Sequence, residues 1–258
     1  MGRVRYERDG AIGWVRLNRP EKLNALDAAG WVALREAVEE AGRDPGCGVV
    51  ILTGEGRAFC AGDDVQEFLR LTDVETAREF FLEQMFPALE AIVRCEKPVI
   101  TAVGGLAYGG GCEIALLSDI TVAAEGATFC LPEGRLGVWA TVFAGAAPSL
   151  VGVRTAKWLA LSMRQLDAHG ALRWGLAAEV VPDAELLDAA RALAADILRA
   201  APSAIAFTKK FLNRHLVEQG LRDVRHALET LVLYSMGSAE VAEGSAAFVE
   251  KREPRFRP

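Results

Sequence analysis

The stretch "KPVITAVGGLAYGGGCEIALLSDI", residues 97–120, decides the fold of this chain. Its first part, "KPVITAVGG", is continuously apolar, which is typical of a strand covered on both faces of a sheet. Its last part, "GGGCEIALLSD", predicts a helix that the chain enters through glycines. A buried strand followed by a helix is the repeating unit of an α/β core.

The same alternation continues on both sides of this stretch. "IGWVRL" at 12–17 and "GVVILTG" at 48–54 predict strands, and the segment between them has apolar residues at helical spacing, with Asp27 as the expected N-cap. A second helical pattern covers about 74–94, and "ITVAAEGATF" at 120–129 predicts a further strand. The first two-thirds of the chain are therefore predicted to form an α/β core.

After Pro182 the chain is predicted to be helical to near its end. We expect a core unit over residues 1–200 and a C-terminal helical region over 201–258, with no linker between them. The apolar faces of these last helices need cover from the core or from another subunit, and periodicity leaves both open. We therefore expect a homo-oligomer.

Composition excludes several classes of protein. The chain has 258 residues, 51% of them hydrophobic, and a net charge of -6, which argues against a nucleic-acid partner. It has no apolar run long enough to span a membrane, and "MGRVRYERDG" at its start lacks the apolar region of a signal peptide. We expect a cytoplasmic protein that does not bind membranes.

The cysteines and histidines do not suggest a metal site. The five cysteines form no C-x-x-C pair, and the three histidines are far apart in helical contexts. Cys60 and Cys112 adjoin the glycine loops discussed next, but small buried thiols are commoner than nucleophiles. We expect reduced cysteines, no metal and no disulfide.

The glycines at 104–111 suggest a site for a carbonyl oxygen. "GGLAYGGGCE" lacks the Lys-Ser/Thr pair of a phosphate loop and the spacing of a dinucleotide loop. Glycines at a helix start also let a ligand reach free N–H groups, which suit an oxygen that becomes an oxyanion. Such a site needs a second N–H, and "AFCAGDD" at 58–64 is the candidate. The alternative is that both are ordinary tight turns.

Two glutamates follow glycine-containing turns. Glu113 falls in the first turn of the predicted helix, and Glu133 lies between a proline and a glycine in "FCLPEGRLG". Two carboxylates beside one polarised carbonyl can act as acid and base if their surroundings separate their pKa values. The alternative for Glu113 is a charge that complements the helix dipole.

Five motifs, in this order along the chain, resemble the enoyl-CoA hydratase/isomerase, or crotonase, family. They are "NRPEKLNAL" at 18–26, "AFCAGDD" at 58–64, "KPVITAVGGLAYGGGCEIALLSDI" at 97–120, "LPEGRLG" at 131–137 and "AFVEKRE" at 247–253. The resemblance implies a spiral of repeated β-β-α units with a C-terminal helical region used in trimerisation. It also implies a trimer or a dimer of trimers, and an acyl-coenzyme A thioester as substrate.

The resemblance assigns roles to residues of this chain. The backbone N–H groups of Asp63 and Gly110 would form the oxyanion hole, Glu113 would help to activate water for attack on Cβ, and Glu133 would deliver a proton to Cα. Coenzyme A would lie along "EKLNA", and the tail would approach it from this subunit or a neighbouring one. The residues implied in binding are Lys22, Leu23, Ala25, Ala61, Phe248 and Lys251.

Two segments depart from the pattern of many hydratases. Trp139, Thr141 and Phe143 replace small and polar residues in a segment that the resemblance places at the acyl pocket, so an unusual acyl group is expected. Gln66 stands where relatives often have lysine, which weakens one contact to the coenzyme.

The pair of glutamates favours a 2-enoyl-CoA hydratase that needs no metal and no cofactor besides the coenzyme A of its substrate. The alternatives are a Δ3,Δ2-enoyl-CoA isomerase, a CoA-thioester hydrolase and, from another class, a non-catalytic acyl-CoA-binding scaffold subunit.

Overall fold

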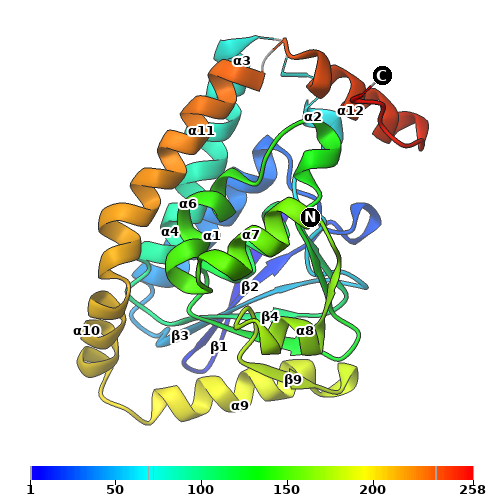
Figure 1. Ribbon diagram of the computed structural model, residues 1–258. Coiled ribbons are helices and arrows are strands. Elements are labelled where there is room, and N and C mark those ends of the chain that lie inside the picture. Colours follow the sequence, from blue (N-terminus) through cyan, green and yellow to red (C-terminus); the bar gives the residue numbers. More distant parts are fainter. Residues whose placement is uncertain (1, 69, 72, 236, 258) are drawn as a thin grey trace.

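The computed structural model describes residues 2–68, 70–71, 73–235 and 237–257. The predicted segments 1–200 and 201–258 have Met1 and Pro258 as their outer ends, and these two residues lie outside the described ranges. Within the described residues the strands form one six-stranded and one three-stranded sheet. The predicted α/β core is confirmed (Figure 1).

The larger sheet is parallel except at one edge. Its strands are, in spatial order, β1 (Val4–Asp9), β2 (Ile12–Leu17), β3 (Val49–Gly54), β4 (Val99–Val103), β6 (Ile120–Ala124) and β9 (Glu179–Val181). Only β1 among them pairs antiparallel with its neighbour. All residues of β4 are buried, as its apolar sequence predicts.

Helices cover both faces of this sheet. On one side α1 (Ala28–Arg43) packs on β1 and β2, and α4 (Phe86–Arg94) packs on α1. The Asp27 side chain accepts a hydrogen bond from the Gly30 N–H, so the predicted N-cap is confirmed. On the other side α9 (Leu186–Leu198) packs on β3, β4 and β6 and lies beneath the sheet in Figure 1.

The smaller sheet consists of β5 (Leu106–Tyr108), β7 (Thr128–Cys130) and β8 (Leu166–Asp167). The prediction of one strand over 120–129 was wrong, because β6 and β7 belong to different sheets. A turn separates them, in which the Gly126 N–H donates a 2.8 Å hydrogen bond to Asp183 Oδ1. The predicted helix after the glycines is α5 (Gly110–Leu117).

The C-terminal helices fold back on the core. The remaining elements are η1 (Pro20–Lys22), α2 (Val65–Phe68), α3 (Val74–Arg78), η2 (Glu79–Met85), η3 (Glu133–Leu136), α6 (Thr141–Leu150), α7 (Val153–Ser162), α8 (Ala168–Arg173), η4 (Asp183–Glu185), α10 (Pro202–Leu212), η5 (Leu216–Gly220), α11 (Leu221–Ser235) and α12 (Ala239–Glu250). The long α11 runs along α6, and α12 packs on η3 (Figure 1). The division into units 1–200 and 201–258 stays a prediction.

No helix in the part of the chain that the structure describes has both the length and the apolar character needed to cross a membrane. All five cysteines are free and buried. The three histidines, His169, His215 and His226, are exposed on helical segments.

Candidate active site

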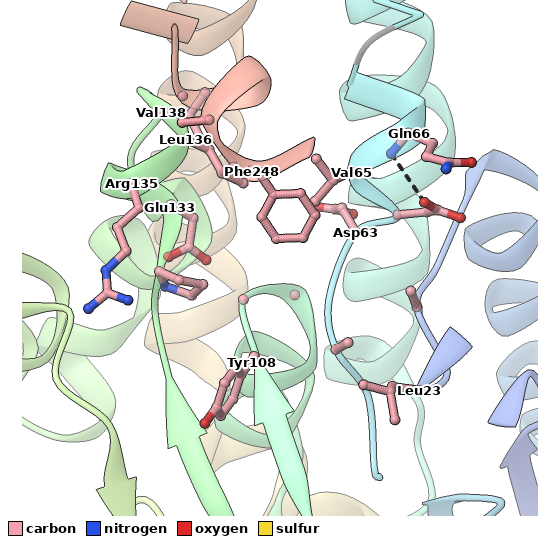
Figure 2. A pocket seen from close by; sticks show the side chains of 18 of the residues that line it. Leu23, Asp63, Val65, Gln66, Tyr108, Glu133, Arg135, Leu136, Val138 and Phe248 are labelled. Atoms are coloured by element: carbon pink, nitrogen blue, oxygen red, sulfur yellow. Dashed lines mark hydrogen bonds between the residues drawn. The ribbon is translucent and has the colours of Figure 1, made fainter. Parts of the chain in front are cut away.

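A cleft of about 750 Å³ opens between the core and the C-terminal helix (Figure 2). Nine of the residues named from the sequence line it: Lys22, Leu23, Ala25, Ala61, Asp63, Gly110, Glu133, Phe248 and Lys251. Phe248 and Lys251 reach it from the same chain, on and just after α12. Gln66 also lines the cleft.

Parallel pairing brings the two glycine loops together. Cys60 pairs with Ala107, and the Tyr108 N–H donates a 2.9 Å hydrogen bond to the Cys60 carbonyl. Asp63 and Gly110 each lie three residues beyond this pair, so the two parallel segments carry them to the same end. A Cβ on Gly62 would lie 3.0 Å from the Gly110 nitrogen, which shows how closely the two backbones approach.

The N–H groups of Asp63 and Gly110 are both available to a ligand. Leu26 bonds to the residues on either side of Asp63, since its N–H donates to the Gly62 carbonyl and its carbonyl accepts from the Asp64 N–H. The Asp63 N–H therefore points away from Leu26. Gly110 begins α5, where the first N–H groups have no partner within the helix. Among the described residues neither N–H donates a hydrogen bond.

Glu133 enters the cleft because Gly109 has no side chain. β7 runs parallel to β5, and the Gly109 N–H donates a 2.9 Å hydrogen bond to the Cys130 carbonyl. Three residues later Glu133 begins η3, and its Oε1 lies 3.3 Å from the position that a Cβ on Gly109 would take. Its Oε2 is buried and has no hydrogen-bond partner among the described residues. Burial raises the pKa of Glu133 to about 7.

Glu113 lies one helical turn after Gly109 and is 3% exposed. Burial and the negative charges of Glu133 and Asp63 raise its pKa well above the usual range. Hydrogen bonds from the backbone at the start of α6 act in the opposite direction, with the Phe143 N–H 3.2 Å from Glu113 Oε1. The two glutamates named from the sequence are therefore close enough to influence each other's protonation.

The loop at 19–26 is held by a residue that the sequence analysis did not single out. Asn24 is 1% exposed and has a positive φ of 57°, as does Leu23 at 54°. Its Nδ2 donates to the carbonyls of Glu55 and Ala58 at 2.9 and 2.8 Å. These bonds hold a backbone conformation that is unfavourable for residues with a side chain. Asn24 is the Asn of "EKLNA", and asparagine's tolerance of a positive φ was the signal available in the sequence.

Four predicted site residues do not line this cleft: Glu113, which is buried behind it, and the three residues predicted to contact the acyl group. Trp139 is 36% exposed, whereas Thr141 is buried and Phe143 is fully buried in the hydrophobic core. The backbone N–H of Phe143, and not its side chain, contacts a predicted site residue, because it donates a hydrogen bond to Glu113 Oε1. The predicted contact of these three side chains with an acyl group stays a prediction.

Comparison with known proteins identifies the family. A sequence model described as enoyl-CoA hydratase/isomerase matches residues 7–258. The chain belongs to the enoyl-CoA hydratase/isomerase family. The family is one of enzymes.

Two curated relatives and a solved structure cover almost the whole chain. A probable enoyl-CoA hydratase of Mycobacterium bovis is 36% identical over 98% of this chain and 97% of its own length. A carnitinyl-CoA dehydratase of Salmonella paratyphi A is 37% identical over 97% of this chain and 96% of its own length. An enoyl-CoA hydratase/isomerase from Xanthobacter autotrophicus Py2 has a TM-score of 0.88 at 31% identity, over 100% of this chain and 99% of its own. The crotonase-like fold is thereby confirmed.

The described residues contain no group of three or more histidine, cysteine or acidic side chains arranged to hold a metal ion. Glycines and apolar side chains line the cleft together with the cationic side chains of Lys22, Arg135, Lys251 and Arg252.

Proposed function

We propose that the protein hydrates the 2,3-double bond of an enoyl-CoA thioester to give a 3-hydroxyacyl-CoA. The proposal is carried by the convergence of two free N–H groups, on Asp63 and Gly110, with the Glu133 carboxyl group at one cleft, and with Glu113 buried close enough to Glu133 to influence its protonation. The enoyl-CoA hydratases among the relatives support the same substrate class.

In the proposed reaction the thioester oxygen accepts hydrogen bonds from the Asp63 and Gly110 N–H groups. Glu113 takes a proton from a water molecule while the oxygen of that water bonds to Cβ. Glu133 gives a proton to Cα. The two N–H groups stabilise the enolate-like charge between these events. The double bond is lost, one C–O and one C–H bond form, and one proton moves from Glu133 to substrate as another moves from water to Glu113.

The hydrogen bonds to the two glutamates support this division of roles, although burial raises the pKa values of both. N–H donation from the start of α6 to Glu113 opposes the effect of burial and favours the ionised form, which a base needs. Glu133 has a buried Oε2 without a donor, which favours the protonated form that an acid needs. Two neighbouring carboxyl groups in a poorly solvated site tend to share one proton.

We further propose that coenzyme A lies along Lys22, Leu23 and Ala25, beside Ala61, with Phe248 and Lys251 across the cleft from them. It enters as part of the substrate, and the reaction needs no metal and no other cofactor. We also propose a cytoplasmic enzyme that forms a homotrimer or a dimer of trimers.

The test is the loss of absorbance of the conjugated thioester when the protein is added to crotonyl-CoA and to longer enoyl-CoAs. E113Q and E133Q should each lower the rate by at least about a hundredfold, as expected for loss of a general acid or base. The exposed Glu125 gives a control, since E125Q should leave the rate unchanged.

Other outcomes would change the assignment. A gain of absorbance with a 3-enoyl-CoA would favour a Δ3,Δ2-isomerase, and release of free thiol would favour a hydrolase. No reaction with any of these thioesters would favour the non-catalytic scaffold. Full activity in E113Q or E133Q would remove that residue from the mechanism.

A further inference from the structure

Asp63 has a side chain in the cleft in addition to its backbone N–H. Asp63, Glu133 and Phe248 all line the cleft, and in the view of Figure 2 the two carboxyl groups are drawn on opposite sides of the Phe248 ring. The Trp31 Nε1–H donates a 2.7 Å hydrogen bond to Asp63 Oδ1. This bond fixes the direction in which the carboxyl group points, because Trp31 is fully buried.

The second oxygen of this carboxyl group is not paired. Among the residues that the structure describes, Asp63 Oδ2 neither accepts a hydrogen bond nor contacts a cation. The neighbouring Asp64 differs, since its Oδ2 lies 2.9 Å from Arg19 Nη1 and 3.8 Å from Lys22 Nζ. Arg19 and Lys22 therefore neutralise Asp64 and leave Asp63 without a positive partner.

Burial raises the pKa of Asp63 to about 7. Its charge in turn raises the pKa values of Glu113 and Glu133. A hydrocarbon acyl group in the cleft would cover Asp63 Oδ2 and leave it without a donor, which is unfavourable. A donor on the acyl group would remove this penalty.

We propose that the Asp63 carboxyl group determines specificity by accepting a hydrogen bond from a hydroxyl on the acyl group, so that the preferred substrates are hydroxylated enoyl-CoAs. The proposal rests on the hydratase function and names its substrate class. The Asp63 N–H is the proposed donor to the thioester oxygen, so the side chain of the same residue is within reach of carbons only a few bonds away.

A neutral hydroxyl fits this site better than a cation. A cation beside Asp63 would lower the pKa values of the neighbouring carboxyl groups as well. It would thereby remove the proton that Glu133 is proposed to deliver. A hydroxyl provides a donor to Asp63 and leaves that proton in place.

Binding of saturated thioesters tests the inference without turnover. Calorimetry would compare 4-hydroxybutyryl-CoA with butyryl-CoA in the unmodified protein and in D63A. We expect the unmodified protein to bind the hydroxylated ligand about tenfold to a hundredfold more tightly, the range for a hydrogen bond to a charged group. D63A should lose this preference.

The ratio of the two affinities separates specificity from a structural role. If Asp63 serves only to hold Trp31, D63A would weaken both ligands equally and leave the ratio unchanged, which would overturn the inference. D63N keeps an oxygen for the Trp31 N–H, so it tests the preference if D63A does not fold. We expect the preference to fall in D63N because the charged acceptor is gone.

Hydration of crotonyl-CoA and 4-hydroxycrotonyl-CoA distinguishes this inference from the proposed function. The role of Asp63 would be overturned if both enoyl-CoAs were hydrated with equal kcat/KM and if butyryl-CoA and 4-hydroxybutyryl-CoA bound equally well. That result would leave the hydratase assignment intact. Selective binding of 4-hydroxybutyryl-CoA without hydration of either enoyl-CoA would overturn the hydratase assignment and leave recognition by Asp63.

Discussion

At the scale of single residues, Glu113 and Glu133 differ in what surrounds their oxygens. Glu113 accepts a hydrogen bond from the first turn of α6, whereas Glu133 Oε2 has no donor among the described residues. Burial raises the pKa values of both, and this difference in hydrogen-bond donors is what lets two residues of the same type take opposite roles in proton transfer.

The first prediction concerns pH. Burial raises the pKa of Glu133 to about 7, and the proposed acid is active only while protonated. The kcat/KM for crotonyl-CoA hydration should therefore fall about tenfold per pH unit above about pH 7. On the acid side it should fall when the two coupled carboxyl groups are both protonated, because no carboxylate is then left to act as the base.

Initial rates between about pH 6 and about pH 9 provide the measurement. The residual activity of E133Q should lack the alkaline fall, because glutamine does not titrate. A profile for the unmodified enzyme that is flat across this range would contradict the assignment of Glu133 as the acid.

At the scale of elements, α5 depends on glycines that allow close contact with its neighbours. A Cβ on Gly111 would lie 2.3 Å from the Cys60 carbonyl oxygen, and one on Gly110 would lie 3.0 Å from the Trp31 ring. Gly109, just before the helix, has a positive φ of 52°. The glycine run lets α5, whose first residue supplies one N–H group, begin close to the segment around Cys60 that leads to the other.

The second prediction follows from Gly111. G111A should reduce the free energy of unfolding by about 1–3 kcal/mol, because the added methyl group overlaps a backbone oxygen that has little room to move. Urea unfolding followed by circular dichroism measures it. The same change at Gly42 in α1 is the control, since its Cβ would meet Cys95 Sγ at an ordinary 3.7 Å.

G42A should be neutral or stabilise the protein by up to about 1 kcal/mol, because alanine favours helix more than glycine does. Equal effects of G42A and G111A would show that helix propensity, and not contact with Cys60, decides the result.

Sequence patterns were sufficient to predict some of the strands and helices but not others. Apolar runs predicted β2, β3 and β4, and helical spacing with an Asp cap predicted α1. The edge strand β1 was not predicted, because its partly exposed residues have no continuous apolar run. The strands β6 and β7 were merged because nothing in the sequence showed that the chain passes from one sheet to the other at Gly126.

At the scale of the whole molecule, a buried lysine connects the C-terminal helices to the core. Lys209 of α10 is 8% exposed, and its Nζ donates to Asp119 Oδ2 at 2.6 Å and to the Lys97 carbonyl at 2.9 Å. Lys97 lies just before β4, and Asp119 lies just before β6.

The third prediction is that K209M destabilises the protein by about 3–5 kcal/mol, because it leaves Asp119 without its positive partner. Thermal and urea unfolding measure the change. K210M is the control on the same helix, since Lys210 is exposed and should alter the stability little. A loss in K209M no larger than that in K210M would show that the ion pair does not hold α10 to the core.

The fourth prediction concerns assembly. Phe207, Phe211 and Leu212 on α10 are 61%, 71% and 78% exposed in the single chain, and burying them would stabilise an oligomer. We expect light scattering to give the mass of a trimer or hexamer, and F211E to shift it towards the monomer. K210E is the control, because it introduces a glutamate at an exposed polar position of the same helix and should leave the mass unchanged. A monomeric mass for the unmodified protein would contradict the oligomer.

The sequence by itself determined the α/β core, the family resemblance and nine of the predicted site residues that line the cleft, because apolar periodicity and contiguous motifs are local properties of the chain. Only the tertiary structure decided that Cys60 pairs with Ala107, which brings Asp63 and Gly110 to one place, and that Gly109 leaves room for Glu133. It also placed Phe143 in the core and gave the Asp63 side chain its partner, Trp31. Such contacts join residues distant in sequence, and their geometry depends on how strands pair and helices pack, which no local pattern specifies.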